Sequence, residues 1–254
     1  MQSNIFLTRF VGHHLVKLVK VDSTNNYLKT LLSNFKPLPT GAVIMADSQF
    51  AGRGQSNNAW LSQTGKNLTF SIYLKPDFLS AQKQFKLNEA IALGITDCLI
   101  KILGDDCKIK WPNDIYFNND KIGGILIENT IRGQQINESV IGIGLNVNQT
   151  VFPDLINPSS LANIAGVDFD LMALLGDILK SVEDRYLQLE AGNYQQIDED
   201  FTQHLFRYQQ TADFKVGIEI IQGKITGITD TGLLIVETAK GEQCFNFKEI
   251  GFVV

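Results

Sequence analysis

Residues 107–131, CKIKWPNDIYFNNDKIGGILIENTI, decide how this chain folds. The runs CKIKW, DIYF and KIGGILIENTI are rich in β-branched and aromatic residues, which is typical of short strands. Asn118, Asn119 and Asp120 lie between the last two runs and tolerate positive φ, so they predict a tight hairpin turn. A chain that passes from strand to strand without an intervening helix indicates antiparallel pairing.

The flanking sequence adds helices, but not in strict alternation with strands. Alternating apolar residues predict strands at 15–21, in GAVIMAD (41–47), in NLTFSIYLK (67–75, half-buried) and in ESVIGIGLNVN (138–148). Helical spacing predicts helices after 22–25, at 85–103 (buried nearly all round), from 169 to about 192, and at 194–205. This order predicts an α+β fold, with a mixed, mostly antiparallel sheet and helices packed on one face.

The C-terminal part changes character. From about Thr211 the glycines at 217, 223, 227, 232, 241 and 251 separate short alternating runs, a pattern that predicts a small SH3-like β-barrel. We therefore expect two domains, a catalytic domain at 1–208 and the barrel at 209–254. Because no linker rich in Pro, Gly or Ser separates them, we expect the barrel to pack on the larger domain.

Composition narrows the class of protein. The 254 residues carry 22 Lys+Arg against 27 Asp+Glu, a net charge of −5, which lacks the basic surplus of a sequence-independent nucleic-acid binder. The three cysteines are odd in number and form no CxxC pair, which argues against a zinc site or a disulfide framework and favours reduced thiols. No signal peptide or membrane-spanning run is visible. We expect a cytoplasmic protein without a membrane partner.

Two polar clusters precede the hairpin region. The tetrapeptide DSTN (22–25) is either a plain helix cap or a cradle of donors and acceptors for a small neutral head group. The run ADSQFAGRGQSNNAW (46–60) places Arg53 between two glycines, which suits a phosphate or a carboxylate. A mobile hairpin loop is the alternative for this run. Trp60 is either a core residue or a surface for a purine ring.

Two further clusters lie within the opening stretch. Lys110 and Asp114 flank a proline that breaks the strand ladder, and form either a surface ion pair or a site for phosphate and a divalent cation. Lys121 begins a strand in which Gly123 and Gly124 leave the backbone open to a flat ligand, although a lysine at a strand start is usually solvated.

Weaker signals complete the set. Glu128, further along that strand, is the expected partner of a cation on the same face. GIGLNVN (142–148) puts Asn146 in an apolar strand, where a buried amide needs partners and an adenine edge is one candidate. There is no Ser-His-Asp order and no Cys-His signature, so the expected chemistry is charge stabilisation of phosphate and carboxylate without a covalent enzyme intermediate.

In this order the motifs resemble those of the biotin protein ligases. The resemblance rests on DSTN, AGRG with its tryptophan, KWPND, KIGGILIE and GIGLNVN, from about residue 15 to 150, and on the C-terminal barrel. Each motif alone is weak, whereas KWPND with KIGGILIE in register is specific. The resemblance implies that biotin and Mg-ATP give biotinyl-5′-adenylate and pyrophosphate, after which a lysine of a biotin carboxyl carrier domain attacks the mixed anhydride.

The resemblance also implies roles for individual residues. The implied catalytic residues are Lys121, Arg53, Asp114 and Lys110. The implied biotin contacts are Ser23, Thr24, Asn25, Gln49, Gly52, Arg53, Lys121, Gly123 and Gly124. The implied ATP or adenylate contacts are Gly54, Gln55, Trp60, Lys110, Asn113 and Asn146. No protein metal site is implied beyond Mg²⁺ arriving with ATP, for which Asp114 is the candidate ligand.

Other expectations concern the form of the protein. Because the first strand begins within about 20 residues, no room is left for the DNA-binding module of larger relatives; we expect a monofunctional ligase, without DNA, as a monomer or weak homodimer. Gln55 and Asn57 stand where many relatives carry Arg and Gly, which weakens the expected grip of the loop on the adenylate. The alternatives are a lipoate or octanoyl ligase or transferase of the same fold, and a non-enzymatic biotin-binding module.

Overall fold

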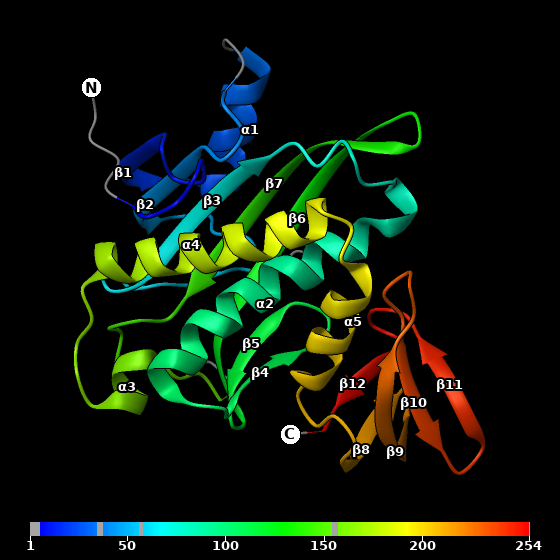
Figure 1. Cartoon of the computed structure of the whole chain (residues 1–254). Helices are drawn as coiled ribbons and strands as arrows, with labels where there is room; N and C mark the ends of the chain where they lie inside the picture. The colour runs from blue at the N-terminus through cyan, green and yellow to red at the C-terminus, as the bar shows by residue number, and fades with distance from the viewer. Residues whose placement is uncertain (1–5, 35–37, 56–57, 154–156, 254) are drawn as a thin grey trace.

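The chain forms two β-sheets, and the candidate site lies on the larger one. The computed structural model describes residues 6–34, 38–55, 58–153 and 157–253 (Figure 1). The larger sheet has seven strands in the order β1-β2-β3-β7-β6-β5-β4; β1 and β2 are parallel and all other neighbours are antiparallel. The strands are β1 Leu15–Val21, β2 Val43–Gln49, β3 Leu68–Leu74, β4 Cys107–Lys110, β5 Asp114–Phe117, β6 Asp120–Arg132 and β7 Gln135–Leu145.

The opening stretch of sequence folds as predicted, into β4, β5 and most of β6. Asn118 has a φ of 50° in the turn between β5 and β6, a conformation that asparagine tolerates better than most residues. Gly123 and Gly124 then pair with Leu145 and Gly144 of β7. The glycine-rich segments of two neighbouring strands therefore lie next to each other.

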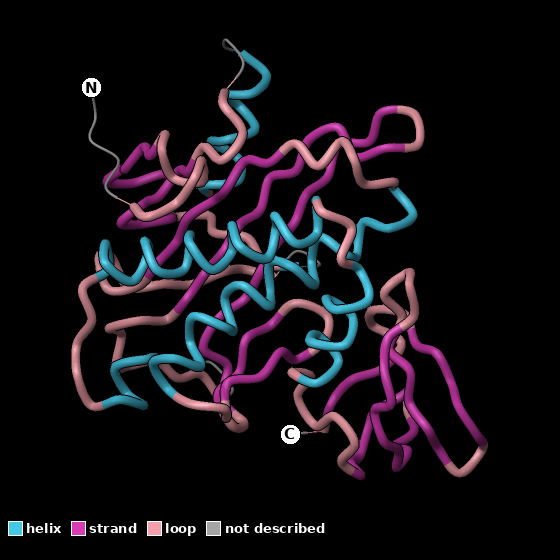
Figure 2. The backbone as a smooth tube through the Cα atoms, in the orientation of Figure 1, coloured by secondary structure: helices cyan, strands magenta, loops and turns pink. Residues whose placement is uncertain are grey.

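Helices cover both faces of this sheet. α2 (Gln84–Leu103), which follows a 3-10 turn at Ala81–Lys83, and α4 (Leu171–Glu190) lie side by side on one face, and α5 (Tyr194–Gln203) leads from them to the second sheet (Figures 1 and 2). α1 (Thr24–Asn34) packs on the opposite face, where Leu28 contacts Ile44 of β2. The predicted α+β class with a mixed sheet is confirmed, with the difference that one helix lies on the other face.

The position of α1 on this other face explains why β3 is fully buried. The alternation in NLTFSIYLK predicts a half-buried strand, but all seven residues of β3 are buried, so that prediction is wrong. α1 covers the face that carries Ser71, and Ser71 Oγ lies within hydrogen-bond distance of Thr24 Oγ1 and Asn25 Oδ1, at 2.7 and 2.6 Å. A polar residue is compatible with burial when its hydrogen bonds are made inside the protein.

A short helix, α3 (Leu161–Ala165), was not predicted from the hydrophobic pattern. Its ends carry ordinary signals: the Ser160 side chain accepts a hydrogen bond from Asn163 N, and Gly166 follows with a φ of 74°. A helix of this length has too few residues to show a period, so only its caps could have predicted it.

The second sheet is antiparallel, with five strands in the order β11-β10-β9-β8-β12, and matches the predicted small barrel. Its strands are β8 Thr211–Val216, β9 Glu219–Ile228, β10 Leu234–Thr238, β11 Gly241–Phe245 and β12 Ile250–Phe252. It packs against the part of the chain that carries the larger sheet, as expected, since Trp111 Nε1 donates to Gly232 O at 2.9 Å and Phe206 contacts Phe252 with ring centroids 6.0 Å apart. One hydrophobic core runs through both sheets.

All three cysteines are free thiols, as predicted. Burial raises the pKa of Cys98 and Cys107 to about 12, so both stay protonated at neutral pH. Cys244 is exposed. Among the described residues, no helix is long and apolar enough to cross a membrane.

Candidate active site

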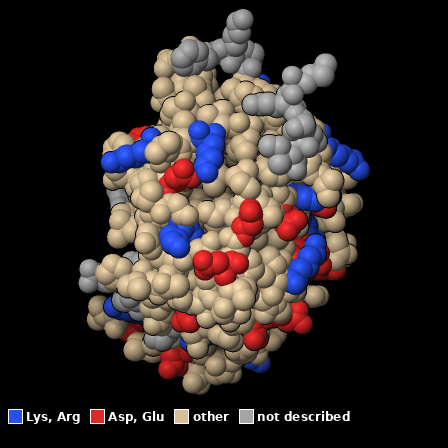
Figure 3. All heavy atoms as spheres, turned by 90° about the vertical axis from the view of Figure 1, so that its left-hand side faces the viewer, with Lys and Arg blue, Asp and Glu red and all other residues tan. Residues whose placement is uncertain are grey.

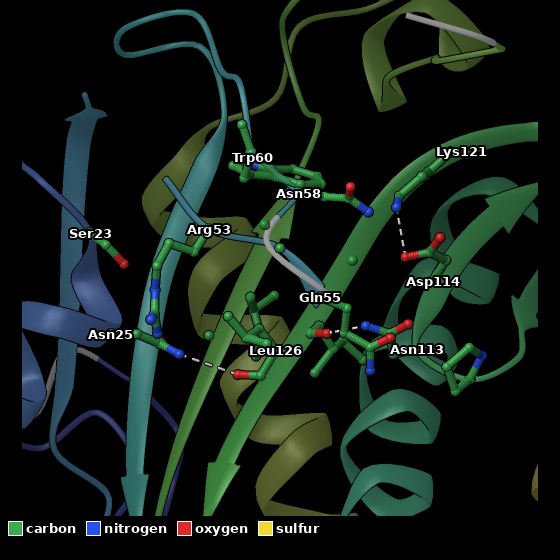
Figure 4. Close-up of a pocket in the computed structure, with 18 of the residues that line it drawn as sticks. Ser23, Asn25, Arg53, Gln55, Asn58, Trp60, Asn113, Asp114, Lys121 and Leu126 are labelled. Carbon is green, nitrogen blue, oxygen red and sulfur yellow. Dashed lines mark hydrogen bonds and ion pairs between the residues drawn. The ribbon is translucent and has the colours of Figure 1, made fainter. Parts of the chain in front are cut away.

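A cavity of about 260 Å³ lies where α1, the 46–60 run, β5, β6 and β7 meet (Figure 4). Most of the residues that the sequence singled out line it together. These are Ser23, Thr24, Asn25, Gln49, Arg53, Gly54, Gln55, Trp60, Asn113, Asp114, Lys121 and Gly124. Segments separated by about a hundred residues therefore contribute to one site.

The floor of the cavity is made of glycines. A Cβ on Gly144 would lie 2.3 Å from the ring of Trp60, and a Cβ on Gly142 would lie 2.5 Å from Asn25 Oδ1. On β6, a Cβ on Gly124 would lie 3.5 Å from the same tryptophan ring. The Trp60 ring and the Asn25 side chain can lie this close to the sheet only because Gly144 and Gly142 have no side chain, whereas the Gly124 distance is an ordinary contact.

One side of the cavity carries an ion pair. Lys121 Nζ of β6 lies 2.6 Å from Asp114 Oδ1 of β5, and both side chains are about one-third exposed, at 34 and 27%. Asn113 next to them is buried, and its side-chain amide donates to Ile125 O. Figure 4 shows these three groups together, opposite Arg53 and Asn25. The lysine is thus held at the cavity wall instead of pointing into solvent.

The other side is a network of hydroxyl and amide groups. Thr24 N donates to Gln49 Oε1 at 2.8 Å, and Thr24 Oγ1 donates to the same oxygen at 3.2 Å. Ser71 connects Thr24 to Asn25, and Asn25 Nδ2 donates to Leu126 O at 3.3 Å. Ser23, Thr24 and Asn25 are all at least 97% buried. Apart from Arg53, the polar groups that line this side are uncharged, as a cradle for a neutral head group requires.

Arg53 is fixed from outside the cavity by Glu128. Arg53 Nη2 donates to Glu128 Oε2 at 2.5 Å, Lys29 Nζ donates to Oε1 at 2.7 Å, and Asn25 Nδ2 donates to Oε2 at 2.8 Å. Burial alone would raise the pKa of Glu128, but these hydrogen bonds outweigh it and hold the pKa below its ordinary value. The expectation that Glu128 partners a cation is confirmed, with two cations.

Two buried polar atoms in the cavity wall have no hydrogen-bond partner in the part of the chain that the structure describes. They are Gln55 Oε1 and Trp60 Nε1. A buried donor or acceptor without a partner costs about 1–3 kcal/mol, so such atoms commonly mark the place of a ligand or water. They lie on the segment for which a nucleotide contact was predicted.

Four predicted site residues lie outside the lining of this cavity. Gly52 packs against the backbone of Trp60 and lines a shallow groove beside the cavity. Gly123 faces the core of the sheet, toward Ile115 and Leu145. Asn146 is buried and donates to Ser159 O at 3.0 Å. The predicted ligand contacts of these three residues therefore have no direct geometric support. Asn57, which was expected to weaken the grip of the loop on the adenylate, falls outside the described residues.

Lys110, the fourth, faces the second sheet. Lys110 Nζ donates to Tyr116 Oη at 3.0 Å and lies 4.5, 5.9 and 5.2 Å from the ring centroids of Tyr116, Phe206 and Phe252. Burial lowers its pKa from 10.5 to about 8, and the Asp114 carboxylate offsets part of that effect. Its cationic head therefore serves the contact between the domains, and its predicted phosphate role lacks geometric support.

This environment predicts a pH-dependent stability. Because the pKa of Lys110 is about 8 in the folded protein and 10.5 ordinarily, the unfolded chain binds more protons between these values. The contribution of Lys110 to the free energy of unfolding should therefore rise with pH from 8 to 10.5. Urea unfolding of the parent and of Lys110→Met across this range would check this prediction. The free energy of unfolding of the parent, relative to that of the variant, should rise with pH. A constant difference between the two curves would contradict it.

Several lining residues had no assigned role. They are Asn58, Ala59, Trp111, Pro112, Ile125, Leu126, Gly142, Ile143, Gly144 and Phe247. Gly142 and Gly144 belong to the GIGLNVN motif, and their alternation in a strand could have predicted that they line the site. Phe247 comes from the turn between β11 and β12, and its ring centroid lies 6.4 Å from that of Trp111. No local pattern links Phe247 to a site built by residues 23–144.

The donor set fits a metal ion only through a bound substrate. The described residues contain no group of three or more His, Cys, Asp or Glu side chains that could hold a metal. Asp114 is the one carboxylate among the described residues that line the cavity. One carboxylate together with phosphate oxygens is a usual environment for Mg²⁺.

Comparison with known proteins agrees with the resemblance seen in the sequence motifs. The Biotin/lipoate A/B protein ligase family matches residues 18–146, and the Biotin protein ligase C terminal domain matches residues 215–250. The chain is 32% identical to the bifunctional ligase/repressor BirA of Bacillus subtilis, over 92% of this chain and 72% of that protein. It is 29% identical to the biotin–[acetyl-CoA-carboxylase] ligase of Paracoccus denitrificans, over 92% of this chain and 99% of that protein.

The fold has solved counterparts as well. The biotin protein ligase of Aquifex aeolicus, solved in complex with biotin and ATP, superimposes with a TM-score of 0.80 at 27% identity. The superposition covers 95% of this chain and 99% of the Aquifex chain, so it includes both sheets.

Proposed function

Because the chain belongs to the biotin protein ligases, within the biotin/lipoate A/B protein ligase family, we propose a two-step reaction for its cavity. A carboxylate oxygen of biotin attacks the α-phosphorus of ATP, the bond to the β-phosphate oxygen breaks, and pyrophosphate leaves. The ε-amine of an acceptor lysine then attacks the carbonyl carbon of biotinyl-5′-adenylate. An amide forms, AMP leaves with the bonding electron pair, and the amine loses a proton.

The observation that carries this proposal is the convergence of a neutral polar cradle and two cations over a glycine floor. Thr24, Asn25 and Gln49 supply uncharged donors and acceptors for the biotin head group. Lys121 and Arg53 stand on opposite sides of the cavity (Figure 4). In the first step negative charge grows on the departing pyrophosphate. In the second step it grows on the carbonyl oxygen under attack and on the departing AMP, and fixed cations at that place lower both barriers.

The residues beside these cations have supporting roles. Asp114 holds Lys121 at the wall through their ion pair and is the candidate protein ligand of the Mg²⁺ that accompanies ATP. When bound, Mg²⁺ neutralises phosphate charge. The unpartnered atoms of Gln55 and Trp60 support contacts of these residues with the nucleotide.

Pyrophosphate release tests the function directly. The protein should release pyrophosphate only with both ATP and biotin, and should transfer labelled biotin to a carrier domain. Release that depends on lipoate or octanoate instead would support the acyl-ligase alternative. Tight biotin binding without any release would identify a binding module.

The substitution at Gln55 gives a quantitative prediction. An arginine there would place a charged fork on a phosphate, which is worth about 1–3 kcal/mol more than a neutral hydrogen bond when partly desolvated. Gln55→Arg should therefore slow the dissociation of pre-formed biotinyl-5′-adenylate about tenfold, and should reduce labelling of bystander lysines. Rates measured by rapid dilution of the parent and variant complexes would decide it. Equal rates, or faster release from the arginine variant, would make Gln55 a neutral substitution.

We also propose the wider setting. The acceptor is the carrier domain of a biotin-dependent carboxylase, as the name of the Paracoccus relative suggests. Three expectations stay predictions: the division into a catalytic domain at 1–208 and a barrel at 209–254, a cytoplasmic location, and a monomer or weak homodimer.

The net charge of −5 supports the expected lack of operator binding by these residues. On the face in Figure 3, the basic and acidic side chains among the described residues are intermingled.

A further inference from the structure

Glu128 connects three parts of the site without lining the cavity itself. It lies on β6, and its two carboxylate oxygens accept from Lys29 and Asn25 of α1 and from Arg53 of the 46–60 run. It borders the shallow groove on the outer side of that run. Among the described residues Glu128 forms the ion pair with Arg53, whereas Asp22 interacts with Arg53 only through its charge.

The carboxylate fixes which way the Asn25 amide points. An ionised carboxylate only accepts hydrogen bonds, so the amino group of Asn25 has to face Glu128. The pKa of Glu128 is lowered by its donors, which keeps the side chain ionised at neutral pH. Asn25 Oδ1 then faces Ser71 Oγ, 2.6 Å away, and lies over Gly142. The orientation of one amide thus sets the donors and acceptors of the whole cradle.

The same carboxylate holds the covering loop. Within residues 52–60 the described backbone contacts are internal: Gly54 N donates to Asn58 O at 2.7 Å, and Trp60 N donates to Gly52 O at 2.9 Å. Two side chains of the described loop residues join the loop to the sheet: Arg53, through its ion pair with Glu128, and Trp60, whose ring lies against Gly144. Figure 4 shows Arg53 extending toward Asn25, away from Lys121.

We propose that Glu128 is a positioning residue that couples the adenylate-covering loop to the biotin cradle, by holding Arg53 and Asn25 on one carboxylate. The proposal rests on the ligase function proposed above and adds a link between its two halves. Disturbing the loop at Arg53 changes biotin recognition through Glu128, and disturbing the cradle at Asn25 changes how long the adenylate stays.

The first measurement compares Glu128→Gln with the parent. Glutamine keeps the size of the side chain but loses the charge, and can present its own amino group to Asn25. The KM for biotin and the dissociation rate of biotinyl-5′-adenylate should both rise about tenfold, the scale of one charge-assisted hydrogen bond, while kcat at saturating biotin changes less than threefold. Glu138→Gln, on β7 where Glu138 accepts from Tyr73 Oη, is the matched control and should leave both values unchanged.

A double-mutant cycle separates positioning from a merely structural role. If Glu128 acts through Arg53, adding Arg53→Ala to Glu128→Gln should speed adenylate dissociation by no more than about twofold beyond the larger single effect. If it acts through Asn25, adding Asn25→Ala should raise the KM for biotin equally little. Independent effects would multiply instead, and multiplication in either cycle would overturn the proposal, because the coupling needs both contacts.

These experiments distinguish failure of the Glu128 proposal from failure of the ligase proposal. A parent protein that releases no pyrophosphate with biotin and ATP would refute the ligase proposal, whereas an active parent with multiplicative cycles would refute only the role of Glu128. Thermal unfolding checks that each variant is folded at the assay temperature. If Glu128→Gln is not, Glu128→Asp takes its place in both cycles, because it keeps the charge while shortening the reach to Asn25 and Arg53.

Discussion

Replacing Lys121 by alanine is expected to slow the formation of biotinyl-5′-adenylate by two orders of magnitude or more. Its ammonium group is held at the cavity wall by Asp114, 2.6 Å away, and stands across the cavity from Arg53. Removing one preorganised donor from such a site costs about 10²–10³ in rate, because water replaces that fixed charge less effectively. Single-turnover formation of labelled adenylate at saturating biotin and ATP measures it.

Biotin affinity separates this role from a general loss of the site. Biotin should bind Lys121→Ala in the absence of ATP with an affinity close to that of the parent, because the neutral cradle around Thr24 and Asn25 is untouched. Lys101→Ala, an exposed position on α2, is the control and should keep full activity. Adenylate formation at the parent rate would remove Lys121 from the mechanism.

The second large effect is expected from adding a single methyl group, in Gly144→Ala. The new Cβ would lie 2.3 Å from the ring of Trp60, far below an ordinary contact, so the ring has to move by about 1 Å or more. A displacement of that size next to the reacting groups costs about a hundredfold, and kcat/KM for ATP in the first step should fall by that factor. The emission of Trp60, one of two tryptophans, should shift to longer wavelength as its ring is exposed.

Gly227→Ala is the matched control for Gly144→Ala. It makes the same change in a strand of the second sheet, where the new Cβ would meet only Ile235 Cδ1, at 3.8 Å. Its activity and emission should equal those of the parent. If Gly144→Ala also retained parental kcat/KM, the glycine floor would have no part in holding Trp60.

The parts of the site that were predictable from sequence are those whose chemistry is local. Asp114 and Lys121 lie seven positions apart in one hairpin, so their motif already placed them on neighbouring strands. Ser23, Thr24 and Asn25 were predicted for a similar reason, since a polar run at a helix start exposes its side chains at one end of the sheet. The strands and larger helices followed from hydrophobic period in the same way.

The missed features depend on contacts between distant segments. Lys110 stands in the same motif as Asp114, but the rings of Phe206 and Phe252 decide where its ammonium group lies. The full burial of β3 required knowing that α1 folds back over Ser71. Asn146 was predicted as a ligand contact because a buried amide needs partners, and Ser159 O supplies one.

Phe247 has a consequence for how the protein is made. The ribosome completes residues 23–144, which build most of the cavity, well before residue 247 emerges, at about 5–20 residues per second. Until the second sheet has been synthesised and has docked, Trp111 lacks both its ring contact with Phe247 and the Gly232 carbonyl that accepts its indole proton. A nascent chain therefore carries a pocket that lacks one part of its wall until the second sheet has docked.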